Sequence, residues 1–103
     1  MIQDNHNRSI NLDFLHKLCR DSHHMSIAYW IENEEFYTVI SSKVVSGTTI
    51  DKKMVFDTMK RIYLENEERR KSGDSPDFNF YLARQGIKSV WKSISGSSEG
   101  WRL

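Results

Sequence analysis

Hydrophobic and polar residues alternate with a period of two over residues 25–31, and the same alternation resumes over residues 36–40. Such alternation places successive side chains on opposite faces of a β-strand. Both runs are rich in β-branched and aromatic residues, and the polar stretch 32–35 separates them. The pattern predicts an antiparallel β-hairpin, with room for a third short strand at 43–46.

Helical periodicity flanks the predicted hairpin on both sides. Asn11 is a suitable N-cap for a first helix, which we expect to end near Asp21. Asp51 is a suitable N-cap for a second helix, the longest of the chain. The apolar residues of the first helix are Leu12, Leu15, Leu18 and Cys19, and those of the second are Val55, Met59, Ile62 and Tyr63.

A third helix is expected near the C-terminus. The triplet Ser75-Pro76-Asp77 combines a capping hydroxyl, a proline for the first helical position and an acid for the first turn. Gly86 costs about 1 kcal/mol against alanine inside a helix, so the sequence allows a kink or a break at this position. The apolar residues that follow at helical spacing are Phe80, Ala83, Ile87, Val90, Trp91 and Ile94.

These elements together predict an α+β fold. The expected order is an N-terminal helix, the hairpin, the long helix and a C-terminal helix packed on the sheet. Residues 10–94 would form a single domain, between a flexible N-terminal arm at 1–9 and a flexible C-terminal tail at 95–103. Trp101 is the one tail residue that could anchor the tail by docking on the domain.

The composition of the chain indicates which class of partner and which cellular compartment to expect. The 103 residues include 15 Lys and Arg against 14 Asp and Glu, a net charge of +1. A general nucleic-acid binder is usually clearly basic, so this balance argues against one. Cys19 is the only cysteine and cannot form an internal disulfide. With no apolar stretch of about 18 residues for a membrane span, and no apolar core of a signal peptide, we expect a cytoplasmic protein.

The candidate metal ligands are His16, Cys19, His23 and His24, because imidazole and thiolate groups are typical zinc ligands. Cys19 belongs to an apolar stripe, however, and the first helix should end before His23. We therefore assign no metal site and no cofactor. The chain also lacks a Gly-x-Ser-x-Gly elbow and a glycine-rich phosphate loop, so nothing in it indicates an enzyme.

The predicted hairpin offers one candidate surface for binding another protein. If the face that holds Tyr29 is buried, the opposite face presents Trp30 and Tyr37 beside the acidic turn. Exposed aromatic residues rimmed by charge are typical of protein-binding hot spots. The alternative is that both rings lie beneath a helix and that the acids only keep the turn soluble. The predicted contact residues are Trp30, Tyr37, Glu32, Glu34 and Glu35.

A second candidate surface lies on the predicted C-terminal helix, where Arg84, Lys88 and Lys92 recur every four residues. Such a basic face could contact phosphates or an acidic protein surface. The alternative is a solvated helix face whose long side chains cover apolar neighbours. The acidic turn and the basic helix would also allow head-to-tail self-association.

We therefore expect a small non-enzymatic module that binds another protein. Its size and lack of catalytic motifs fit an inhibitor or regulator, of the kind that immunity and anti-defence proteins represent. The alternative is a regulator that binds nucleic acid through Arg84, Lys88 and Lys92.

Overall fold

The computed structural model describes residues 24–74, 77–97 and 99–101. Regular secondary structure over these residues consists of four α-helices: α2 (His24–Glu32), α3 (Glu34–Val45), α4 (Lys52–Lys71) and α5 (Phe80–Ser95). None of the described residues belongs to a β-strand, so the α+β prediction is wrong and the described fold is all-α. The predicted N-terminal arm at 1–9 and the predicted helix at 11–21 lie outside the described residues.

Helices α2 and α3 occupy the segment predicted to be a hairpin. In α2 the buried apolar residues are Ile27, Trp30 and Ile31, whose spacing of three and four residues is that of one helix face. In α3 Phe36 and Ile40 are buried one turn apart, and the predicted third strand is the end of this helix. Alternation alone does not distinguish a short strand from a short helix that is apolar on more than one side.

The polar stretch between the two runs begins a helix instead of turning a hairpin. Asn33 is the N-cap of α3, and its side-chain oxygen accepts a hydrogen bond of 2.9 Å from the Phe36 amide. Glu34 and Glu35 occupy the first turn, where negative charge stabilises the exposed amides of a helix N-terminus. A cap followed by acids is therefore the sequence signal for a helix start that the hairpin interpretation overlooked.

The long helix α4 is confirmed, including its N-cap. The Asp51 side chain accepts a hydrogen bond of 2.9 Å from the Met54 amide. Two polar side chains on its buried side bond back to the helix, Thr58 to the carbonyl of Met54 and Asn66 to that of Ile62. These bonds satisfy polar groups that would otherwise be costly to bury.

Helix α5 begins later than the sequence predicts. Its N-cap is Asn79, whose side chain accepts a hydrogen bond of 3.0 Å from the Leu82 amide, so the predicted start at Ser75-Pro76-Asp77 is wrong. The helix continues through Gly86 and ends at Gly96, which caps it with a φ of 80°. A positive φ of this size favours glycine because a β-carbon would be strained there.

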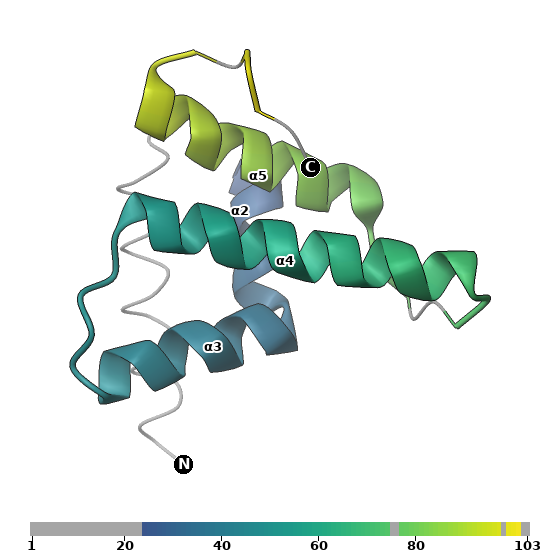
Figure 1. Ribbon diagram of the computed structural model, residues 1–103, viewed down its shortest axis with the longest axis horizontal. Coiled ribbons are helices and arrows are strands. Elements are labelled where there is room, and N and C mark those ends of the chain that lie inside the picture. Colours follow the sequence, from purple (N-terminus) through teal and green to yellow (C-terminus); the bar gives the residue numbers. More distant parts are fainter. Residues whose placement is uncertain (1–23, 75–76, 98, 102–103) are drawn as a thin grey trace.

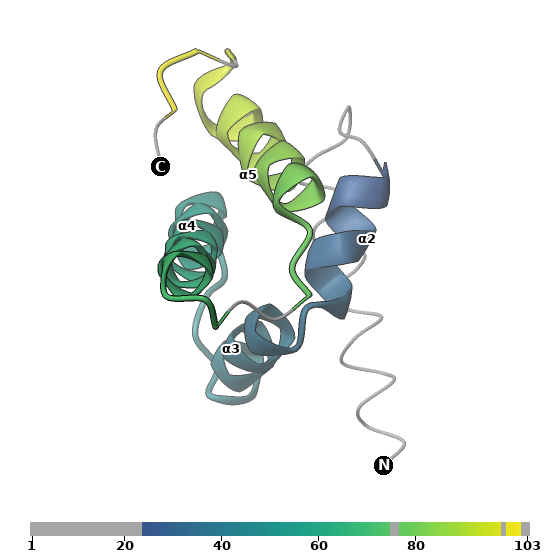
Figure 2. The same ribbon diagram turned by 90° about the vertical axis from the view of Figure 1, so that its right-hand side faces the viewer.

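The four helices surround one core, in the order α2, α3, α4, α5 and back to α2 (Figure 2). Helices α4 and α5 lie side by side, and α2 passes behind them in Figure 1. The predicted packing of the C-terminal helix on a sheet is therefore replaced by packing on α4 and α2. Within the described part of the chain, no helix has both the length and the apolar content needed to cross a bilayer.

An aromatic cluster fills one end of the core. Phe78, just before α5, lies with its ring centroid 5.9 Å from that of Tyr29, 6.4 Å from that of Trp30 and 6.3 Å from that of Tyr63. All three contacts are edge-on, the geometry that aromatic quadrupoles favour, and each such pair contributes about 0.5–1.5 kcal/mol beyond its area. The segment before α5 is thereby fixed to α2 and α4.

Candidate binding surface

Trp30, the central residue of the predicted hairpin surface, is completely buried, with 0% of its surface exposed. Its indole Nε1 donates a hydrogen bond of 2.9 Å to the carbonyl oxygen of Ala83 in α5. Its ring also lies edge-on to Phe36, with 5.4 Å between the centroids. Trp30 therefore belongs to the core of this structure and is not presented to a partner.

The other residues of that predicted surface remain near the corner between α2 and α3. Glu32 ends α2 and is exposed, and Glu34 is exposed at the start of α3. Tyr37 is half-buried on α3. Glu35 is engaged, because Arg61 of α4 lies 3.3 Å from its carboxylate. The structure thus brings three acids and one tyrosine to this corner and separates them from Trp30.

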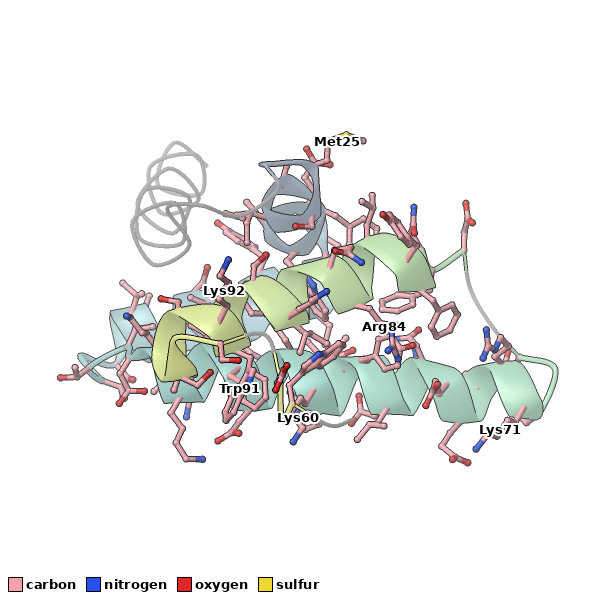
Figure 3. The ribbon with its side chains drawn as sticks, turned by 90° about the horizontal axis from the view of Figure 1, so that it is seen from above. Met25, Lys60, Lys71, Arg84, Trp91 and Lys92 are labelled. Atoms are coloured by element: carbon pink, nitrogen blue, oxygen red, sulfur yellow. The ribbon has the colours of Figure 1, made fainter. Side chains whose placement is uncertain are left out.

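The predicted basic residues share one face of α5. Arg84, Lys88 and Lys92 are all exposed, and they follow one another at intervals of one helical turn. The opposite face of α5 is buried in the core, and its buried residues are Ala83, Gly86, Ile87 and Val90. Figure 3 shows Lys92 on the side of α5 that points away from α4. Neither Lys88 nor Lys92 forms an ion pair with another described residue, unlike Arg61, Lys53 and Lys71 of α4.

Tyr81 belongs to the same exposed face, and sequence reasoning missed it. It stands three residues before Arg84 and seven before Lys88, and 70% of its surface is exposed. Its position relative to the buried residues Ala83 and Ile87 was the available signal, since a helical wheel places it opposite them. We define the α5 face as Tyr81, Arg84, Lys88 and Lys92.

Two contacts fix α5 against α4 and so orient the α5 face. At one end the guanidinium of Arg70 lies 4.3 Å from the centroid of the Phe80 ring. At the other end the Lys52 amine donates a hydrogen bond of 3.1 Å to the carbonyl oxygen of Ser93. The cation–π contact contributes about 0.5–1 kcal/mol at an exposed position. The two helices therefore lie antiparallel, and the α5 face is held on a packed helix pair.

Residues after α5 return to it and contact the α5 face. The Trp91 indole Nε1 donates a hydrogen bond of 2.8 Å to the carbonyl oxygen of Glu99. The guanidinium carbon of Arg84 lies 5.0 Å from the centroid of the Trp101 ring. Trp101 is half-buried and packs against the core. Of the predicted tail, residues 99–101 are thus in contact with α5 in this structure.

The environment of the Tyr29 phenol shifts its pKa. Partial burial raises its pKa above the ordinary 10.0, a hydrogen bond of 2.8 Å from the Asn79 amide opposes the rise, and the charge of Asp77 adds to it. The phenol oxygen accepts this bond at the N-cap of α5, so Tyr29 helps to position the helix start. Its role is structural, since it lies in the aromatic cluster and not on the α5 face.

The candidate metal ligands His16, Cys19 and His23 lie outside the described residues, as does the side chain of His24. Among the residues whose side chains are described, no three His, Cys, Asp or Glu are close enough to hold a metal ion. No family model matches the chain, and neither a curated protein nor a solved structure matches it.

Proposed function

We propose that this chain is a non-catalytic domain that binds a larger protein through the α5 face. The proposal depends on one observation. The highly exposed Tyr81 lies on the same helix face as Lys88 and Lys92, and neither lysine has a carboxylate partner among the described residues. A partner with an acidic surface would supply those carboxylates and cover the ring. An inhibitor or regulator of that partner would act in this way, in the cytoplasm.

The residue types of the α5 face favour a protein over a nucleic acid. Tyrosine and arginine are enriched among the residues that dominate binding energy at protein interfaces. The face holds three cations, and the whole chain has a net charge of only +1. Three cations would neutralise few phosphates, and phosphate contacts supply most of the affinity in non-specific nucleic-acid binding.

A nucleic-acid partner is the second candidate, and the contact between Arg84 and Trp101 is the observation in its favour. Basic residues beside aromatic rings are the composition of surfaces that bind single strands. Salt dependence separates the two candidates. Phosphate contacts give a steep fall of log K with log salt, roughly 0.7–0.9 for each phosphate neutralised, whereas an interface centred on an apolar ring gives a shallow one.

The direct test is affinity capture from a lysate of the native cells with a charge-reversed face. The full chain and its Lys88→Glu/Lys92→Glu variant are immobilised, and nuclease-treated lysate is passed over both. We expect one protein to be retained in stoichiometric amount by the wild-type chain and to be lost with the variant. Both substitutions lie on exposed positions, so the helical spectrum should be unchanged.

The matched control is Lys43→Glu/Lys71→Glu, which changes the total charge equally at two exposed lysines of α3 and α4. This variant should retain the partner. Equal loss with both variants would show that total charge, and not the α5 face, determines binding. Loss of all retention on nuclease treatment would favour the nucleic-acid candidate.

A further inference from the structure

Two aromatic side chains edged by cations meet between α4 and α5, the buried Phe56 and the half-buried Trp91. Phe56 of α4 and Trp91 of α5 lie with 5.2 Å between their ring centroids. The Lys60 amine is 5.0 Å from the centroid of Phe56, and Arg84 stands two turns from Trp91 along α5. Figure 3 shows Trp91 and Lys60 on the same side of the helix pair. We define these four residues as the α4–α5 seam.

Residues 99–101 of the chain bind to the seam in this structure. They reach it through a turn held by serine hydroxyls, in which Ser95 Oγ donates to the Ser97 carbonyl and Ser97 Oγ accepts from the Glu99 amide. Beyond that turn, Trp91 binds the Glu99 carbonyl and Arg84 covers the Trp101 ring. The segment runs back beside α5 (Figure 1), and in Figure 2 it lies on the same side of α5 as α4.

We propose that the α4–α5 seam is a binding site for an acidic segment that contains tryptophan, and that residues 99–101 occupy this site in cis. A partner protein would insert a segment of the same chemistry and displace them. This inference deepens the proposed function and rests on it, because it names the part of the partner that meets Arg84.

The contacts of residues 99–101 define what the site recognises. The indole N–H of Trp91 selects a backbone carbonyl, and the guanidinium of Arg84 selects the face of an aromatic ring two residues later. Lys60 and Arg84, the cations of the seam, favour carboxylates in the incoming segment. The Glu99 carboxylate forms no ion pair with another described residue, so residues 99–101 supply no carboxylate to these cations, and an acid in the partner's segment could do so.

Occupation in cis would regulate the site. A segment joined to α5 by a short turn is present at an effective concentration on the order of millimolar. An incoming segment must compete with residues 99–101. The apparent affinity of the incoming segment is its intrinsic affinity multiplied by the fraction of chains in which the site is open. Removing the Trp101 ring should therefore increase the affinity for a segment supplied in trans.

The test uses the full chain with Trp101→Ala, labelled with ¹⁵N, and an acetylated peptide Ser-Ser-Glu-Gly-Trp that repeats residues 97–101. The variant retains two indoles, those of Trp30 and Trp91. We expect the peptide to shift the Trp91 indole signal saturably and to leave the Trp30 signal in place. The wild-type chain should require about 10-fold more peptide. A peptide with alanine in place of tryptophan should shift neither signal.

A folded Trp101→Ala chain whose Trp91 signal does not respond to millimolar peptide would overturn the proposal, as would equal affinity of variant and wild type. If Trp101→Ala loses the dispersed spectrum of a folded chain, Trp101→Leu takes its place with the same expectations. Loss of fold in both variants would also overturn the proposal, because Trp101 would then belong to the core. A wild-type dimer that Trp101→Ala dissociates would assign the site to a second copy, against the proposal.

The charge-reversed variant Lys88→Glu/Lys92→Glu separates this inference from the proposed function. Its seam keeps Arg84 and Trp91, so it should still bind the peptide after losing the partner protein. If the wild-type chain captures a partner but the Trp101→Ala variant does not bind the peptide, the proposed function is supported and the proposed binding role of the seam is contradicted.

Discussion

The indole nitrogen of Trp30 donates a hydrogen bond of 2.9 Å to the carbonyl oxygen of Ala83, a residue 53 positions later in the chain. Trp30 is fully buried, so its N–H would otherwise have no water to bond. Such a hydrogen bond usually contributes about 1 kcal/mol to the free energy of unfolding. Removing one of its two partners costs more, because the other is left buried without a partner. The bond ties α2 to α5 and fixes the largest side chain of the core.

Replacing Trp30 and Tyr37 separately distinguishes core from surface. We expect Trp30→Ala to lower the free energy of unfolding by about 3–5 kcal/mol, the usual cost of removing a buried large aromatic side chain. Tyr37→Ala should cost much less, because Tyr37 is only half-buried. Urea unfolding followed by circular dichroism measures both values. Equal small losses would contradict the burial of Trp30.

Gly86 is the position where α5 passes closest to Trp30. A β-carbon at residue 86 would lie 2.4 Å from Cδ1 of Trp30 and 3.3 Å from the carbonyl oxygen of Ser26. Gly86→Ala should therefore destabilise the chain, since overpacking costs about 1–3 kcal/mol. The helix-propensity gain of about 1 kcal/mol offsets part of this loss. Thermal unfolding measures the change.

Ser89→Ala on the same helix is the control for Gly86→Ala, because it removes an oxygen and adds no volume. Its melting temperature should stay close to that of the wild type. A Gly86→Ala chain that is more stable than the wild type would show that Trp30 does not approach α5 as described.

Tyr29 makes stability depend on pH in the alkaline range. Burial raises the pKa of its phenol above 10.0 in the folded chain, so the unfolded chain loses this proton first as pH rises. The stability it contributes is complete below pH 10 and is lost as pH rises through the raised pKa. Unfolding free energies of wild type and Tyr29→Phe between about pH 8 and 11 measure this effect.

The two stability curves should be parallel below about pH 10. Above this pH the unfolding free energy of the wild type should fall more steeply than that of Tyr29→Phe, because the phenyl ring of the variant has no proton to lose. At neutral pH Tyr29→Phe should be less stable by roughly 0.5–1.5 kcal/mol, since the Asn79 amide loses its acceptor. Curves that stay parallel throughout would contradict the raised pKa.

The sequence was informative where one signal dominated. In α4 the Asp51 cap and the stripe of Val55, Met59 and Ile62 all indicated one helix, which the structure confirms. In α2 the signals disagreed. Met25 and Tyr29 fit an alternating strand as well as a helix, and 71% of the Met25 surface proves to be exposed. Short apolar segments are decided by what they pack on, here Gly86 and Ala83 of α5.

The two candidate sites also differ in how far the sequence could predict them. Exposure of Arg84, Lys88 and Lys92 could be inferred, because charged residues at one-turn spacing opposite an apolar stripe define an outer helix face. Burial of Trp30 could not, because it depends on a bond to Ala83 far along the chain. The contact between Arg84 and Trp101 likewise depends on a turn after α5, whose direction the Ser and Gly residues do not specify in isolation.

A photo-cross-linking amino acid placed at Tyr81 or at Tyr37 tests most directly whether the α5 face is the recognition surface. Benzoylphenylalanine carries a benzoyl group in place of the tyrosine hydroxyl, and irradiation of the native cells joins it to whatever lies against it. We expect a covalent adduct with one protein from position 81 and none from position 37. An adduct from position 37 alone would contradict this expectation and return the interface to the corner of Glu32, Glu34 and Glu35.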